Sequence, residues 1–213
     1  MQTDSVPSSL PIETRGESRK GAALRRALSL IVAPWLVFYL WAAGSVVAGL
    51  QGFGALGHLW DTRPGWGVVH FLLGVLPGGV LLLDGAWRAW ARRATAEGVA
   101  RWAWVAEVAA SLTWWLGLGG WSWSATRGQW GALELYDRLA GALARTDGGG
   151  PWPGMLLSLG SALCVERLIA AVAAPWRGAN SRSHLSVRIA GMAASALMFV
   201  AVIVLATGAL FSD

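Results

Sequence analysis

Five long apolar runs, each about 20 residues or more, are the feature that most constrains this chain of 213 residues. They cover residues 28–50, 66–87, 102–124, 152–176 and 187–211. About 20 consecutive apolar residues are what an α-helix needs to cross the hydrocarbon core of a bilayer. Charged residues make up only 14% of the chain, whereas a soluble domain usually has about a quarter. The pattern therefore predicts an all-α polytopic membrane bundle with five transmembrane helices.

Basic residues gather in every second gap between the runs. The basic-rich gaps hold Arg15, Arg19, Lys20, Arg25, Arg26, Arg88, Arg92, Arg93, Arg101, Arg177, Arg182 and Arg188. The alternate gaps hold Arg63, Arg127, Arg138 and Arg145. The positive-inside rule places the basic-rich gaps in the cytoplasm. We therefore expect a multi-pass protein of a bacterial-type inner (plasma) membrane, with its N-terminus inside and its C-terminus outside.

Tryptophan supports the same span boundaries. Most of the 15 tryptophans fall close to a predicted span end, where an indole keeps its ring in lipid and its N–H near water. The net charge of +5 is explained by arginines that flank the spans, and no basic stripe with interleaved aromatic residues is present. The expected partner is thus the lipid bilayer, and nucleic acid is not expected.

Two segments outside the spans have a distinct composition. Residues 1–27 are polar and contain two prolines, which predicts a disordered cytoplasmic tail. Residues 129–144 place apolar side chains at helical spacing, with charged residues between them. This second segment is predicted to be a short amphipathic helix on the outer membrane surface.

The two outer loops suggest an internal duplication. Residues 53–56 and 130–133 both have an aromatic residue followed by Gly-Ala-Leu, and residues 59–61 and 135–137 both have Leu-aromatic-Asp. One hypothesis is a two-span unit used twice in the same orientation, with the fifth span added, as in parallel repeats of transporters. The alternative is chance similarity, because Gly, Ala, Leu and Trp are abundant throughout this chain.

Small residues in two spans form candidate packing faces. Gly74 and Gly78 are spaced by four residues in the second span, and Pro77 between them predicts a kink. Gly191 and Ser195 have the same spacing in the fifth span. We expect these residues to allow close helix–helix packing, with a cavity at the kink as the alternative.

Ionisable residues within spans are candidate functional residues because lipid penalises exposed charge. Asp84, Glu107, Glu166 and Arg167 all fall in the cytoplasmic half of the predicted bundle. One hypothesis is a polar inner vestibule in which Glu107 or Glu166 changes protonation. The other is a structural Glu107–Arg167 pair between the third and fourth spans, with Asp84 and Glu166 reaching headgroups.

His70 lies near the outer end of the second span, where it is a candidate ligand or an interfacial polar residue. A haem site usually needs a second axial ligand, and no other histidine falls within a span. Cys164 is the only cysteine, so neither an intramolecular disulfide nor a cysteine cluster can form. We predict no metal site and no cofactor, and expect water or a neighbouring side chain to satisfy His70.

Signatures of soluble enzymes are absent from the sequence: there is no Gly-x-Ser-x-Gly elbow, no phosphate-binding glycine loop and no His-Glu-x-x-His. The leading functional hypothesis is therefore a non-enzymatic subunit or scaffold of a larger inner-membrane complex, bound to other membrane subunits or to copies of itself. The first alternative is a small transporter or proton-linked channel that uses the inner-half charges. The second is an intramembrane cofactor-binding protein.

Overall fold

The computed structural model describes residues 19–49, 65–93, 102–119, 152–176 and 181–208. Within these ranges the chain is almost entirely helical and contains no strand. The helical elements are α1 (Arg19–Val47), α3 (Gly65–His70), the π-helix η1 (Phe71–Val75), α4 (Leu76–Arg92), α5 (Ala103–Thr113), the π-helix η3 (Trp114–Gly119), α8 (Trp152–Ala173), the short 3₁₀ turn η4 (Ala174–Trp176) and α9 (Ser181–Gly208). The prediction of an all-helical fold is confirmed for this part of the chain.

Four helices are long and apolar enough to cross a membrane. They cover Lys20–Val47, Gly65–Arg92, Ser158–Trp176 and His184–Val204. The third predicted span is helical from Ala103 to Gly119, and its last residues lie outside the described part of the chain. The structure thus supports a membrane-embedded protein with several apolar helices, while a fifth span stays a prediction.

Some helices extend beyond the apolar runs. Helix α1 begins at Arg19, so it takes in residues 19–27, which were assigned to the tail. That part of the tail prediction is wrong, because alanine, leucine, lysine and arginine all favour helix and the apolar run marks only the lipid-facing length. Helix α4 likewise continues to Arg92. The predicted surface helix, 129–144, and the outer loops of the proposed duplication lie outside the described residues.

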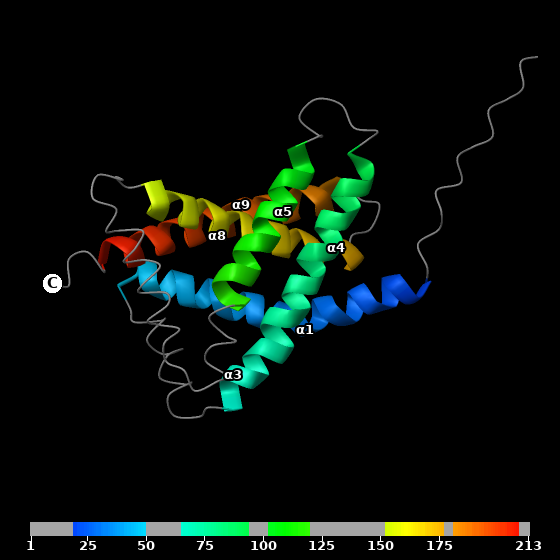
Figure 1. Cartoon of the computed structure of the whole chain (residues 1–213), viewed down its shortest axis with the longest axis horizontal. Helices are drawn as coiled ribbons and strands as arrows, with labels where there is room; N and C mark the ends of the chain where they lie inside the picture. Colours follow the sequence, from blue (N-terminus) through cyan, green and yellow to red (C-terminus); the bar gives the residue numbers. More distant parts are fainter. Residues whose placement is uncertain (1–18, 50–64, 94–101, 120–151, 177–180, 209–213) are drawn as a thin grey trace, which may run out of the picture.

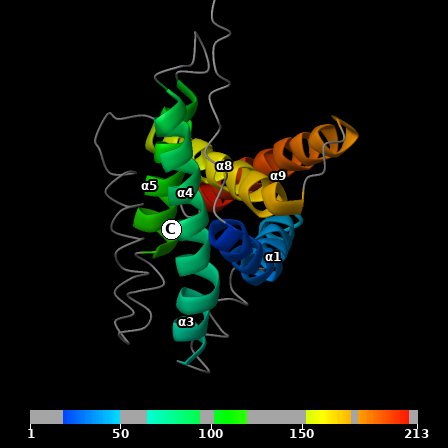
Figure 2. The same ribbon diagram turned by 90° about the vertical axis from the view of Figure 1, so that its right-hand side faces the viewer.

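The helices form two sets that cross each other. In Figure 1, α1, α8 and α9 run across the view, while α4 and α5 run steeply over them. Figure 2 shows α4 and α5 side by side on the left, with α1, α8 and α9 to their right. Helix α8 packs most extensively against α9 and also contacts α5 and α1. Helix α8 therefore connects the two sets.

The helix ends that the predicted threading assigns to the cytoplasm lie toward one side of the molecule. In Figure 1, the start of α1, the end of α8 and the start of α9 lie on the right, and the end of α4 and the start of α5 lie at the top. Successive described helices therefore alternate in direction. This arrangement is compatible with the predicted threading, although the side that faces the cytoplasm remains a prediction.

The core is apolar, and so is much of the outer surface. Only 28% to 50% of the residues in each candidate span are buried inside the protein. Large apolar side chains such as Leu116 and Leu156 are 75% and 68% exposed. Water would penalise so much exposed apolar surface, whereas a lipid environment is compatible with it.

Glycines near the middle of the second candidate span leave room for aromatic rings. A Cβ on Gly74 would lie 3.0 Å from Trp35, and a Cβ on Gly78 would lie 2.6 Å from Trp114 Cζ2. The indole N–H of Trp114 donates to the Val75 carbonyl at 2.9 Å, in the last residue of η1. The small residues thus lie at helix–helix contacts, but their closest neighbours there are indole rings and not a second backbone.

The remaining candidate packing residues occupy less crowded positions. Pro77 is buried in the first turn of α4, directly after the π-helix. Gly191 of α9 is buried, and a Cβ there would lie 3.5 Å from Glu166 Cγ of α8. Ser195 lies one turn further along α9 and is half-buried. Gly191 therefore faces α8.

Candidate functional site

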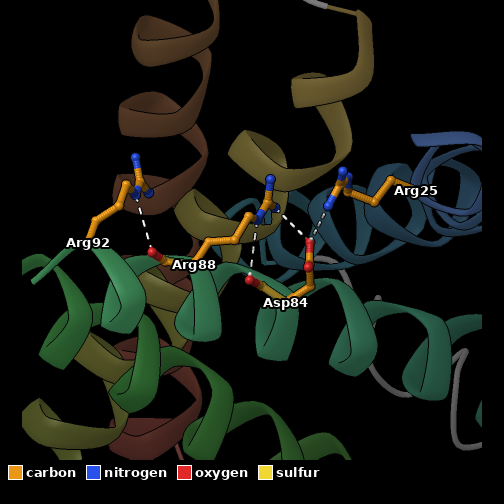
Figure 3. A network of polar contacts seen from close by, with 4 residues as sticks. All are labelled: Arg25, Asp84, Arg88 and Arg92. Carbon is orange, nitrogen blue, oxygen red and sulfur yellow. Dashed lines mark hydrogen bonds and ion pairs between the residues drawn. The ribbon is translucent and has the colours of Figure 1, made fainter. Parts of the chain in front are cut away.

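The first cluster of ionisable side chains joins α1 to α4 (Figure 3). Asp84 Oδ2 accepts a hydrogen bond from Arg25 Nη1 at 3.3 Å and lies 2.8 Å from Arg88 Nη2. Asp84 and Arg88 are four residues apart on α4, the spacing that brings side chains of one helix face together. Arg92, one turn further on, donates through Nε to the Arg88 carbonyl at 3.2 Å. The Asp84 carboxylate thus contacts two guanidinium groups, one from each helix.

The second cluster joins α5 to α8. Arg167 Nη1 donates to Glu107 Oε1 at 3.3 Å, and the two side chains are 28% and 19% exposed. Arg167 Nε also lies 3.3 Å from Glu166 Oε2, which is within ion-pair distance but does not meet hydrogen-bond geometry. A Cβ on Gly85 of α4 would lie 3.2 Å from Glu107 Oε2. The absence of a side chain at Gly85 therefore leaves space for the Glu107 carboxylate.

A regular antiparallel register positions the second cluster. Each step of three residues along α5 is matched by a step of three or four in the opposite direction along α8. The contacting pairs are Glu107 with Arg167, Ala110 with Cys164, and Thr113 with Gly160. Because these spacings correspond to one helical face, the ion pair lies at one end of a continuous contact stripe. Cys164 is buried and donates through Sγ to the Ala110 carbonyl at 2.9 Å.

The predicted inner-half charges therefore form two clusters. Asp84 contacts Arg25 and Arg88, while Glu107, Glu166 and Arg167 lie together. Adjacent helical residues point about 100° apart, so Asp84 faces α1 whereas its neighbour Gly85 faces α5. Asp84, Glu107, Glu166 and Arg167 were predicted at a similar depth in the membrane, but they do not all meet at one site.

Sequence analysis missed Arg25 as a site residue because it was assigned to the tail. The helical periodicity of α1 would have revealed Arg25 as a residue that faces the other helices. The buried stripe of α1 comprises Ser29, Val32, Leu36, Tyr39, Ala43 and Val46. Arg25 continues this stripe by one turn toward the N-terminus. It is consequently directed at α4, where its side chain is only 17% exposed.

His70 is fully buried and bonded to a residue that was not singled out. Its Nε2 lies 2.6 Å from the Tyr39 hydroxyl of α1. The Trp35 ring packs edge-on against His70, with ring centroids 4.9 Å apart. Trp114 packs edge-on against Tyr39 at 5.9 Å. His70 therefore belongs to an aromatic contact between α1, α3 and η3.

The described residues provide ion pairs and hydrogen bonds between helices, and they contain no group of three or more His, Cys, Asp or Glu side chains arranged to hold a metal ion. Comparisons with known protein families, characterised proteins and solved structures found no match.

Proposed function

We propose that this chain is a five-span inner-membrane protein with a cytoplasmic N-terminus, serving as a non-enzymatic subunit or scaffold of a larger membrane complex. The observation that carries this proposal is the pairing of ionisable side chains across helix interfaces. Glu107 contacts Arg167 between α5 and α8, and Asp84 contacts Arg25 between α4 and α1. Charges used in this way hold helices together within lipid.

The position of α9 agrees with a role in assembly. Among the described elements, α9 packs chiefly against α8 and α1. Its outward positions include Leu185, Ile189 and Met192, which are 60%, 53% and 60% exposed. An apolar helix at the edge of a bundle offers a face to lipid or to the helices of other subunits.

The threading is tested by reporters fused after Asp213. We expect alkaline phosphatase at this position to be active, since the C-terminus is proposed to face the outside. Green fluorescent protein at the same position is expected to remain dark. Fluorescence in the cytoplasm with an inactive phosphatase would contradict the proposed orientation.

The subunit role is tested by affinity purification in a mild detergent. We expect other membrane proteins, or further copies of this chain, to be recovered in a fixed ratio. A stable monomer without partners, recovered from membranes of the native host at native expression level, would contradict the proposed role. The reporter result is independent of this outcome.

A proton-linked transporter is the second candidate, and one observation favours it. Among the described residues, Glu107 and Glu166 both form ion pairs with Arg167, so these three side chains together carry a net negative charge when both carboxylates are ionised. Protonation of one carboxylate would neutralise the cluster in a low-dielectric environment. Proton-coupled uptake that is lost in a folded Glu107→Gln variant would favour this candidate over the subunit role.

A further inference from the structure

Tyr39 and His70 form a hydrogen-bonded pair of titratable groups that neither candidate function uses. The Tyr39 hydroxyl lies 2.6 Å from His70 Nε2, and the two residues are 8% and 0% exposed. A neutral imidazole that carries its proton on Nδ1 accepts a hydrogen bond at Nε2, so in this tautomer the phenol donates. A base that can receive the Tyr39 proton is therefore already in contact with it.

A base at contact distance decides whether this phenol can lose an electron. Removal of one electron from a phenol also releases its proton, because the phenol radical cation is a very strong acid. Water takes up that proton at a protein surface, whereas the core of a bilayer contains no water to do so. His70 Nε2 can take it inside the protein. The pair thus has the arrangement of a one-electron donor that keeps its own proton.

A series of aromatic rings connects the buried pair to the outer surface of α1. The ring centroids of Tyr39 and Phe38 are 6.3 Å apart, and Phe38 stacks on Trp41 at 5.8 Å. Trp41 is 53% exposed, and it lies within the candidate span Lys20–Val47. Electrons cross such short gaps between rings without movement of the chain. An oxidant in the surrounding lipid can therefore take an electron at Trp41 and draw on Tyr39.

Two further indole rings border the pair. The ring centroids of Trp114 and Tyr39 are 5.9 Å apart, and those of Trp35 and His70 are 4.9 Å apart. A phenol that can pass its proton to a base is easier to oxidise than an indole. We therefore expect an electron lost from any of these tryptophans to be replaced from Tyr39, which makes Tyr39 the end point of the oxidation.

We propose that Tyr39 is a one-electron donor to lipid peroxyl radicals, with His70 as the proton acceptor and Trp41 as the site of contact with the radical. Peroxyl radicals are one-electron oxidants that form in the lipid phase, from unsaturated acyl chains and oxygen. This inference rests on the membrane placement of α1 but does not depend on the subunit role.

The reaction balances in electrons and protons. The peroxyl radical takes one electron from the Trp41 ring, and the resulting hydroperoxide anion takes a proton from water at the membrane surface. The oxidised Trp41 ring takes one electron from Tyr39, whose hydroxyl proton moves to His70 Nε2. The products are a lipid hydroperoxide, hydroxide, a neutral tyrosyl radical and an imidazolium group.

The first test locates the radical. Full-length protein with ring-deuterated tyrosine is oxidised in detergent by flash-generated ruthenium(III) tris-bipyridine, and frozen samples are studied by electron paramagnetic resonance. We expect a tyrosyl spectrum narrowed by deuterium. Tyr136 is the other tyrosine of the chain, so Tyr136→Phe is the matched control for Tyr39→Phe. The signal should be lost in Tyr39→Phe and kept in Tyr136→Phe, and a radical found on tryptophan alone would overturn the role of Tyr39.

The second test concerns the base. His70→Gln keeps a hydrogen-bond acceptor but removes the base, so we expect the Tyr39 radical to form about a hundredfold more slowly. If this variant does not fold, the rate in the unaltered protein is compared in H₂O and in D₂O after full exchange. The rate should be lower in D₂O. An unchanged rate in a folded His70→Gln variant, or equal rates in H₂O and D₂O, would overturn the proton transfer to His70.

The third test concerns the oxidant. Protein in liposomes of unsaturated phosphatidylcholine is exposed to a lipid-soluble azo initiator, and oxygen uptake is recorded. We expect a lag that is shortened in Tyr39→Phe and in Trp41→Phe. Trp87→Phe is the control, because it removes a 69% exposed indole from α4. A lag independent of Tyr39, despite its oxidation by ruthenium, would overturn the assignment of peroxyl radicals. That failure would leave the reporter test of the threading unaffected.

Discussion

Arg167 of α8 donates a hydrogen bond to Glu107 of α5 at 3.3 Å, directly beside the position where α4 has Gly85. Three helices thus meet at one ion pair. The two side chains are largely buried, so removing either one leaves a buried charge with less compensation.

Glu107→Gln should destabilise the protein by about 1–3 kcal/mol, because the partly buried Arg167 loses one of its carboxylate partners. The measurement is thermal or denaturant unfolding in detergent micelles. Glu166→Gln is the matched control, since Glu166 is more exposed than Glu107 and its ion pair within the described part of the chain is with its neighbour Arg167. We expect a loss below about 1 kcal/mol for this control. A Glu107→Gln variant as stable as the wild type would contradict a structural role for the Glu107–Arg167 pair.

Gly78→Ala should destabilise the protein by about 1–3 kcal/mol through overpacking. The added Cβ would lie 2.6 Å from Trp114 Cζ2, and Trp114 is fixed by its bond to the Val75 carbonyl. The same change at Gly44 of α1 meets no atom within 4 Å. Gly44→Ala should therefore leave stability unchanged or raise it by up to about 1 kcal/mol. Unfolding measurements that rank the two variants in the opposite order would contradict this packing.

Arg25 and Asp84 should be energetically coupled. A double-mutant cycle of Arg25→Gln and Asp84→Asn is expected to give an interaction energy of about 1 kcal/mol, because the pair is partly exposed and Asp84 is shared with Arg88. Arg26, the next residue on α1, points about 100° away and serves as the control. A cycle of Arg26→Gln with Asp84→Asn should be additive. Additive effects in both cycles would mean that the Arg25 contact does not contribute to stability.

The apolar runs predicted the helical fold well, because lipid imposes a length and a composition that are visible in sequence. They predicted helix ends less well. Residues 19–27 of α1 are helical although four of the nine are charged, since a helix nucleated within an apolar span can extend beyond it. The π-helices η1 and η3 were not predicted, because hydrophobic periodicity does not distinguish a widened turn from a regular one.

The candidate site was predicted in part. Depth along the helices placed Asp84 near Arg88 and placed Glu107 near Arg167, and the structure has both contacts. Depth alone does not say which face of a helix meets which neighbour. This is why Asp84 was grouped with Glu107, although Asp84 faces α1. The position of a residue around its helix axis depends on how the helices pack, which one sequence does not reveal.

The hydrogen bond between Tyr39 and His70 should also contribute to stability. The bond is 2.6 Å long, Tyr39 is 8% exposed and His70 is fully buried. Tyr39→Phe removes the hydroxyl and leaves a buried ring nitrogen without this bond, so we expect a loss of about 1–3 kcal/mol in detergent unfolding. Trp41→Phe changes an aromatic side chain on the same helix that is 53% exposed, and it should alter stability by less than about 0.5 kcal/mol. Equal stability of the Tyr39→Phe variant and the wild type would show that the bond makes no net contribution to holding α1 against α3.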